Sequence, residues 1–317
     1  MTALVSAWTL DGKGRGDEID DLQGCLHVDG KTPLWVHLMR LEADAVEYLD
    51  CIPETPPTVQ KALFAEDTRP RCDIFNDGVL LNLRAVNRNV GADPTELLTL
   101  RVWATENRVI SLRRHKVNAA AEIRESIEKG YGPKSVMDFL LVLTETLTEE
   151  LTDLVETLED RFELMEEDDD NLDSDAISDL RKEVVAYRRF IDPQLAALTK
   201  LANAQLTWLH EGDRNSLRHV VDMVARQREQ LEALRERAAI LRDTHSSRQA
   251  EKMNQTIYFL TIVAGLFLPL SFVTGLLGIN VGGIPGAEGG SAFWWVVIGM
   301  VVTAVAEIAI LKFKKLI

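Results

Sequence analysis

The sequence predicts an α+β membrane protein, in which an N-terminal α/β domain is followed by a long helical stalk and two transmembrane helices. The membrane part is indicated by two apolar runs near the C-terminal end. No charged side chain occurs between Lys252 and Glu288, and the second run, 292–311, has Glu307 as its only charge. Each run reaches the roughly 20 residues that a helix needs to cross a bilayer. Upstream, strand-like segments give way near residue 130 to long helical segments.

Residues 1–132 are expected to form a cytoplasmic α/β domain. The candidate strands are Leu4–Leu10, Cys25–Val28, Leu34–Leu38, Cys72–Leu83 with a turn at Asn76–Gly78, and Leu97–Leu112 with a turn at Glu106–Asn107. The candidate helices are Ala43–Leu49, Pro57–Phe64 and Asn118–Lys129, the last of which ends at Gly130. We find no glycine-rich phosphate loop and no Ser/His/Asp arrangement, so the sequence does not predict an enzyme.

The cysteines and histidines offer a few candidate metal ligands. The chain has 3 cysteines without CxxC spacing, as expected for reduced thiols in the cytoplasm. On the predicted strand, Cys25 and His27 would share one face, either as two metal ligands or as ordinary packing residues; no second pair completes a tetrahedral site. His210, His219 and His245 either bind zinc transiently or are simply exposed or packed, since no two of them have the spacing of helix-face ligands.

Residues 133–253 are predicted to form a cytoplasmic hairpin of long helices and a stalk. The expected helices span about 134–167, about 174–209, and from 213 onward. Pro193 falls inside the second helix and should kink or interrupt it. No helix breaker occurs between Asn215 and the first apolar run, so the third helix and the first span should form one continuous helix.

An acidic tip separates the first two long helices. It consists of Glu166, Glu167, Asp168, Asp169 and Asp170. Because the second helix should run antiparallel to the third, the tip would lie near the bilayer and near the C-terminal tail. The negative electrostatic field of the tip would concentrate cations there. Alternatively, the tip is simply a solvated acidic turn.

Charge distribution predicts the orientation in the membrane. The tail, 312–317, carries Lys312, Lys314 and Lys315, whereas the loop between the spans, 281–291, has no Lys or Arg. The positive-inside rule therefore places the tail in the cytoplasm, and two spans bring the N-terminal part to the same side. The formal net charge of -15 argues against a nucleic-acid partner and favours cations.

The first span, 254–280, carries a stripe of small or polar residues at heptad spacing. The stripe consists of Asn254, Thr261, Ala264, Leu268, Ser271, Gly275 and Gly278, of which only Leu268 is large and apolar. Several copies could turn this stripe towards a partly polar axis, or the stripe could form a tight helix–helix contact without a pore. Pro269 frees the carbonyl of Gly265 and is a candidate hinge. The second span is predicted at 292–311.

The membrane part resembles the CorA superfamily of metal ion transporters, which have two spans and a Gly-x-Asn signature. The resemblance is carried by the run from Pro269 to Phe272 and by Gly278, Ile279 and Asn280 at the outer end of the first span. The residues from Leu277 through the loop 281–286 are similar to those of the zinc transporter ZntB branch.

This resemblance implies a funnel-shaped homopentamer in a bacterial inner membrane. A ring of Gly278, Ile279 and Asn280 at the outer mouth would hold a hydrated cation through the amide oxygen of Asn280. The implied cargo is Zn²⁺, with Cd²⁺, Ni²⁺, Co²⁺ and Mg²⁺ as further possibilities, and no cofactor is implied. The expected partners are other copies of the chain, the lipid bilayer, divalent cations and, if transport is coupled, protons.

Two alternatives and two acidic residues stay open at this point. One alternative is a CorA-type Mg²⁺/Co²⁺ channel, and the other is a membrane-anchored scaffold or sensor that conducts nothing. Glu288, the only charge of the loop, either attracts cations or is merely exposed. Glu307 lies inside a span, where ionisable residues are usually functional, but its short distance in sequence from Lys312 also allows a structural pairing.

Overall fold

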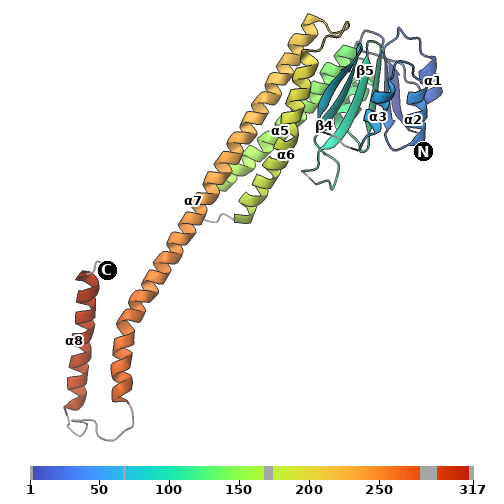
Figure 1. Ribbon diagram of the computed structural model, residues 1–317. Helices are drawn as coiled ribbons and strands as arrows, with labels where there is room; N and C mark the ends of the chain where they lie inside the picture. The colour runs from blue at the N-terminus through green and yellow to red at the C-terminus, as the bar shows by residue number, and fades with distance from the viewer. Residues whose placement is uncertain (1–2, 67–68, 94, 168–173, 279–290, 314–317) are drawn as a thin grey trace. The chain divides into compact units, whose positions relative to one another are not determined.

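The structure is a computed structural model that describes residues 3–66, 69–93, 95–167, 174–278 and 291–313 (Figure 1). The chain divides into two compact units, Met1–Arg242 and Asp243–Ile317. We describe each unit by itself, beginning with the first, which contains the sheet and most of the helices.

The first unit is built on a six-stranded mixed sheet with the order β1-β2-β6-β5-β4-β3. The strands are β1 (Leu4–Thr9), β2 (Leu34–Met39), β3 (Arg71–Phe75), β4 (Gly78–Ala85), β5 (Leu98–Thr105) and β6 (Arg108–Arg113). Strands β2 and β6 are parallel, and every other pair is antiparallel. Four of the five predicted strand regions are therefore confirmed, together with both predicted hairpin turns.

The hairpin between β3 and β4 depends on two special residues. Asn76 has a φ of 52°, a left-handed conformation that asparagine tolerates better than most residues. Gly78 begins β4, and a Cβ atom there would lie 2.3 Å from the Trp103 ring, so only glycine lets that ring pack against the strand. The turn thereby fixes the register of Phe75 against Gly78.

The predicted strand Cys25–Val28 is wrong, because this segment is the short helix α1 (Leu22–His27). Asp21 caps the helix, and its Oδ1 accepts a hydrogen bond from the backbone N–H of Gly24 at 2.6 Å. In the helix, Cys25 is buried whereas His27 is not, so these side chains do not share a face. The pairing of Cys25 with His27 as metal ligands loses its structural basis.

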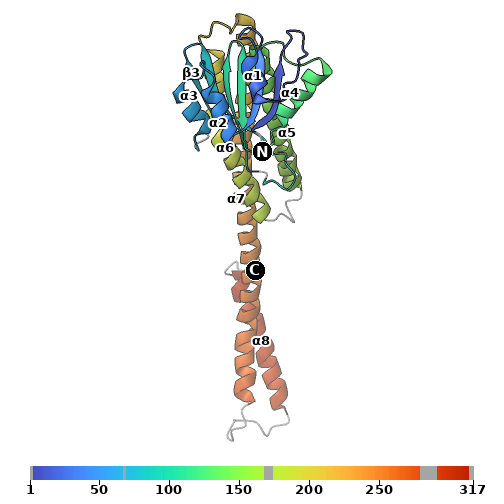
Figure 2. The same ribbon diagram turned by 90° about the vertical axis from the view of Figure 1, so that its right-hand side faces the viewer.

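Helices cover both faces of the sheet (Figures 1 and 2). The predicted helices are confirmed as α2 (Ala43–Asp50), α3 (Pro57–Phe64) and α4 (Asn118–Lys129), with Gly130 in the left-handed conformation that ends α4. Alternate residues of the strands supply two cores. Leu80 and Ile110 pack with α1, α2 and α3, whereas Leu81 and Val109 pack with α4 and the long helices.

The long helices are α5 (Val136–Glu167), α6 (Ser174–Ala202) and α7 (Glu211–Leu277). Helix α6 ends at Ala202 rather than near residue 209, which corrects the prediction. The reason is tertiary: Asp77 of the β3–β4 turn accepts a hydrogen bond from the Thr207 backbone N–H at 2.8 Å, and its carbonyl accepts one from the Trp208 indole at 2.7 Å. Pro193 lies inside α6 without ending it.

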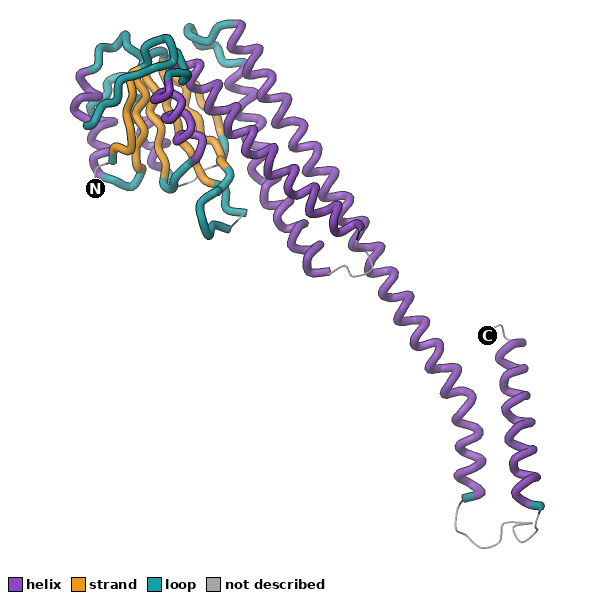
Figure 3. Tube along the Cα trace, turned by 180° about the vertical axis from the view of Figure 1, so that it is seen from behind, coloured by secondary structure: helices purple, strands orange, loops and turns teal. Residues whose placement is uncertain are grey.

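The second unit contains the last part of α7 and the helix α8 (Ala292–Phe313), which lie side by side (Figures 1 and 3). Helix α7 is unbroken from Glu211 to Leu277, which confirms the prediction that one helix leads into the first span. Within the described residues, two helices are long and apolar enough to cross a membrane, namely α7 and α8 from Phe293 onward. Their large apolar side chains, such as Phe267 and Trp295, are mostly exposed in the single chain.

Candidate functional site

The small and polar stripe on α7 is exposed along its whole described length. Its members are Asn254, Thr261, Ala264, Leu268, Ser271, Gly275 and Gly278. The positions of α7 that are half-buried in this stretch are different ones: Ile262, Val263, Leu266, Pro269, Leu270 and Val273. Because successive helical residues turn by about 100°, these two sets lie on nearly opposite sides of the helix. The stripe is therefore not covered by α8 within one chain.

The chemistry of the stripe is that of small residues and hydroxyls. The Thr261 hydroxyl donates a hydrogen bond to the carbonyl of Ile257 at 2.8 Å, so its own oxygen can still accept one from outside the helix. A Cβ added to Gly275 would meet nothing within 4 Å, and the same holds for Gly265. The helix backbone is therefore open to water or to a neighbouring chain at these two levels.

The C-terminal end of the stripe is described only as far as Gly278. Its backbone N–H donates to the carbonyl of Thr274 at 2.9 Å, which completes the last turn of the helix. Ile279 and Asn280 of the predicted ring lie outside the described residues, as does Glu288 of the loop. The hinge role of Pro269 stays a prediction, since α7 is helical on both sides of it.

Helix α8 has a half-buried face of its own. This face includes Val296, Met300, Thr303, Ala304 and Glu307. The Oε2 atom of Glu307 is buried and has no hydrogen-bond partner in the part of the chain that is described. No ion pair between Glu307 and Lys312 is found among the described residues. Glu307 thus lies away from the exposed stripe, on the half-buried face of its helix.

The acidic tip is only partly described, because Asp168, Asp169 and Asp170 fall outside the described ranges, as do Lys314 and Lys315 of the tail. Of the remaining acids, Glu166 forms an ion pair with Arg237 of α7 at 2.5 Å. One acid of the tip is therefore already paired within its own unit. The proximity of the tip to the bilayer and to Lys312 stays a prediction.

Among the described residues, His210, His219 and His245 do not gather into a metal site. Over the described ranges, no group of three or more His, Cys, Asp or Glu side chains is arranged to hold a metal ion. His245 is largely buried, and its Nε2 lies 2.9 Å from Nε2 of Gln249 on the same helix.

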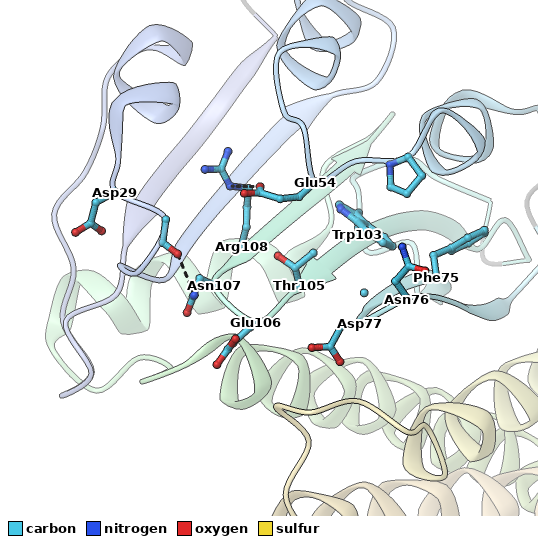
Figure 4. A pocket seen from close by; sticks show the side chains of 13 residues that line it. Asp29, Glu54, Phe75, Asn76, Asp77, Trp103, Thr105, Glu106, Asn107 and Arg108 are labelled. Atoms are coloured by element: carbon cyan, nitrogen blue, oxygen red, sulfur yellow. Dashed lines mark hydrogen bonds and ion pairs between the residues drawn. The ribbon is translucent and has the colours of Figure 1, made fainter.

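A cavity of about 350 Å³ at one edge of the sheet was not anticipated from the sequence (Figure 4). Its acidic lining residues are Asp29, Glu54, Asp77 and Glu106. The carboxylate of Asp77 binds Thr207, and Glu54 lies 4.0 Å from Arg108. Two of the four acids are thus engaged in structural contacts. The cavity is formed by residues from separate strand ends, so only the sheet order could have revealed it.

The chain matches a protein family and several relatives over most of its length. A family model described as "CorA-like Mg2+ transporter protein" matches residues 30–315. The divalent cation transporter CmaX of Pseudomonas aeruginosa is 36% identical over 298 residues, which cover 92% of this chain and 90% of that relative. The zinc transport protein ZntB of Pectobacterium carotovorum is 31% identical over 298 residues, again covering 92% and 90%.

A solved structure supports the same relationship. The structure of the full-length CmaX protein has a TM-score of 0.88 and 34% sequence identity to this chain, covering 99% of this chain and 98% of that one. Both relatives are named as transport proteins, which agrees with the prediction of a transporter rather than an enzyme. Because the family match covers most of the chain, the protein belongs to the family of CorA-like Mg²⁺ transporter proteins.

Proposed function

We propose that the protein moves divalent metal cations across a bacterial inner membrane, with Zn²⁺ as its main cargo, through the axis of a homopentamer. The observation that carries this proposal is the exposed stripe on α7, which lies on nearly the opposite side of the helix from the half-buried face. In lipid, helices associate through small residues and polar side chains rather than through large apolar ones. Five copies turned inward along the stripe would enclose an axis lined by hydroxyls, an amide and open backbone.

Such an axis suits an ion that keeps its water. Hydroxyl and amide oxygens are hard acceptors that bind the inner water shell of a divalent cation without stripping it. At the outer mouth, Asn280 would contribute its amide oxygen to a ring of five, next to Gly278, which leaves the backbone accessible. Leu268 is the one large apolar side chain of the stripe, so a ring of Leu268 side chains would form a hydrophobic constriction of the pore. Such constrictions can close a pore by excluding water.

Zn²⁺ is favoured because a relative named zinc transport protein ZntB is 31% identical over 92% of the chain. A relative named only as a divalent cation transporter is 36% identical, so a Mg²⁺/Co²⁺ channel is the second candidate. The proposal includes cytoplasmic N- and C-termini, as the basic residues of the tail suggest. Transport is either passive or coupled to protons.

The test is zinc flux into proteoliposomes containing the purified full-length protein. Asn280→Ala should reduce flux about ten-fold or more if its amide holds the hydrated ion, and Ser271→Leu should block the axis. Val301→Ala on the exposed side of α8 is the matched control and should leave flux unchanged. Equal flux for wild type and Asn280→Ala would contradict the assigned filter.

Three further arms separate the alternatives. Competition by Mg²⁺ or Co²⁺ stronger than by Cd²⁺ would favour the Mg²⁺/Co²⁺ channel. Dependence of flux on an imposed pH gradient would establish proton coupling. A detergent-solubilised mass equal to a dimer, together with no flux of any cation, would favour the non-conducting scaffold, because two copies cannot enclose the stripe.

A further inference from the structure

Glu150 of α5 is an acid that the first unit buries without a hydrogen-bond partner. Only 4% of the residue is exposed, and in the part of the chain that is described neither carboxylate oxygen accepts a hydrogen bond. Acids are rarely buried to this degree unless they are paired. A neutral carboxylic acid tolerates such a site far better than a carboxylate does, because the ionised form loses its hydration there.

The positive charge beside Glu150 is engaged with a different acid. Arg88, in the loop between β4 and β5, donates a hydrogen bond from its Nη2 to Oδ2 of Asp153 at 2.7 Å. Glu150 and Asp153 are three residues apart on α5, so they are neighbours on one face of the helix. Arg88 therefore lies beside both acids, yet within the described ranges it binds only Asp153.

The ion pair between Arg88 and Asp153 is exposed and therefore weak. The two side chains are 44% and 66% exposed, and ion pairs at such positions add little to stability because water screens them. A guanidinium group carries five N–H groups, and the bond to Asp153 uses one of its terminal nitrogens. Arg88 can therefore turn towards a second acid without losing much.

The other charges that face Glu150 are acidic. Burial is the main cause that raises the pKa of Glu150 to about 7, and the charges of Glu122 on α4 and of Asp153 raise it further. Arg88 and the backbone N–H of Val86 act in the opposite direction, although neither donates a hydrogen bond to Glu150 in this structure. Ionisation of Glu150 thus adds a third negative charge to this cluster, next to Arg88.

An ionised Glu150 should attract Arg88 more strongly than Asp153 does. The Asp153 side chain is exposed, so water solvates its charge whether or not Arg88 is bound. The charge of Glu150 would be buried, where an unpaired carboxylate is costly and where its attraction to a guanidinium group is screened less. The proton on Glu150 should therefore decide which acid Arg88 binds.

We propose that Glu150, Arg88 and Asp153 form a proton-controlled switch between the β4–β5 loop and α5. While Glu150 carries a proton, Arg88 binds Asp153 at the surface. When Glu150 loses its proton, Arg88 turns inward to pair with the new carboxylate, its bond to Asp153 weakens, and the loop segment around Arg88 moves with it. The first unit would thereby respond to pH near neutrality. The inference does not rest on the transport function proposed above.

The test is a pH titration of a fluorescent label placed beside Arg88 in the full-length protein in detergent. Val90 is fully exposed, so Val90→Cys can carry a dye that is sensitive to its surroundings. Cys51→Ser removes the exposed native cysteine, whereas Cys25 and Cys72 are buried. We expect a sigmoidal change of emission with a midpoint near pH 7, because the loop moves when Glu150 loses its proton.

Two controls separate this switch from general effects of pH. Glu150→Gln should abolish the transition, because glutamine stays neutral at every pH. The same dye on Leu41→Cys, an exposed residue between β2 and α2, should show no transition near pH 7. Absence of a transition at residue 90, the same transition in Glu150→Gln, or equal transitions at residues 90 and 41 would each overturn the proposal.

A second measurement identifies the acid that Arg88 binds. A double-mutant cycle of Arg88→Gln and Asp153→Asn, measured by urea unfolding, reports the coupling between these two side chains. We expect a coupling of about three-fold in the unfolding equilibrium constant at pH 6, which falls towards none at pH 8. In a Glu150→Gln background, the coupling at pH 8 should equal that at pH 6. Equal coupling at both pH values in protein that retains Glu150 would overturn the exchange of partners.

Discussion

The two units of the chain differ in the exposure of their tryptophan side chains. In Met1–Arg242, Trp35 and Trp103 are 0% and 2% exposed, whereas in Asp243–Ile317, Trp294 and Trp295 are 65% and 70% exposed. The first unit therefore buries its apolar surface within one chain and can be stabilised by its own core. The second unit leaves its apolar surface exposed in the single chain, as expected for helices that cross a membrane. Stability and function should accordingly depend on different residues in the two units.

The largest expected effect on the free energy of unfolding comes from replacing a buried tryptophan rather than an exposed one. Trp35→Ala should destabilise the first unit by about 3–5 kcal/mol, because it empties a buried site where the Trp35 indole donates to Ser111 at 2.8 Å and packs against Phe139. Trp294→Ala should change the unfolding of the first unit by less than about 0.5 kcal/mol. Urea unfolding in detergent, followed by circular dichroism, measures both. Similar losses for the two variants would contradict the division between the units.

An intermediate effect should come from Glu150, a buried acid of the first unit. It is 4% exposed, and neither carboxylate oxygen has a hydrogen-bond partner among the described residues. Burial raises its pKa from 4.5 to about 7, and the nearby charge of Glu122 adds to this, while Arg88 opposes it. The folded state therefore holds this proton more tightly than the unfolded state does. Stability contributed by the neutral acid is complete below pH 4.5 and is lost as pH rises towards 7.

Glu150→Gln tests this sign directly, because glutamine stays neutral at every pH. Relative to wild type, the variant should gain about 1–3 kcal/mol of unfolding free energy at pH 8 and much less at pH 5. Urea midpoints at the two pH values measure the difference. The control is Asp153→Asn, which removes an exposed acid that pairs with Arg88 at 2.7 Å and should lose stability slightly at pH 8. A larger gain at pH 5 than at pH 8 would refute the assignment.

Local sequence signals predicted most elements because those elements are determined locally. The left-handed Gly130 ends α4, and the absence of breakers after Asn215 makes α7 continuous. Where the prediction failed, one cause was a contact that the pattern does not contain. This holds for α6, which ended early because Asp77 of a distant turn binds Thr207. The helix at Cys25 was instead a missed local signal, because its capping residue Asp21 lies only three residues before Gly24, whose N–H it accepts.

The candidate sites also differ in whether a local sequence pattern or only the tertiary structure reveals them. The stripe on α7 could be recognised because heptad spacing on one helix is visible in the sequence, and its role in lining a pore stays a prediction. The cavity of Figure 4 could not, because its acidic residues Asp29, Glu54, Asp77 and Glu106 are far apart in sequence and meet only through the sheet order. The ring expected at Asn280 depends on other copies, which no pattern within one chain can position.

The smallest expected effect concerns side-chain hydrogen bonds, which join two helices in the first unit and stay within one helix in the second. Gln227 of α7 is 2% exposed, and its Nε2 donates to the Thr148 carbonyl at 2.9 Å and to the Thr152 hydroxyl at 2.5 Å, both on α5. Gln227→Leu should cost the first unit about 1 kcal/mol, since two contacts between helices are lost. The Thr303 hydroxyl of α8 instead donates to Gly299 of its own helix at 2.9 Å.

Thr303→Val keeps the shape of the side chain and should change unfolding by less than about 0.5 kcal/mol, because a hydroxyl bound to its own helix adds little to tertiary structure. Both variants are measured by urea unfolding in the same detergent. A loss for Thr303→Val as large as that for Gln227→Leu would mean that this hydroxyl also holds helices together. The second unit would then carry specific tertiary contacts of its own, and the contrast with the first unit would be one of degree.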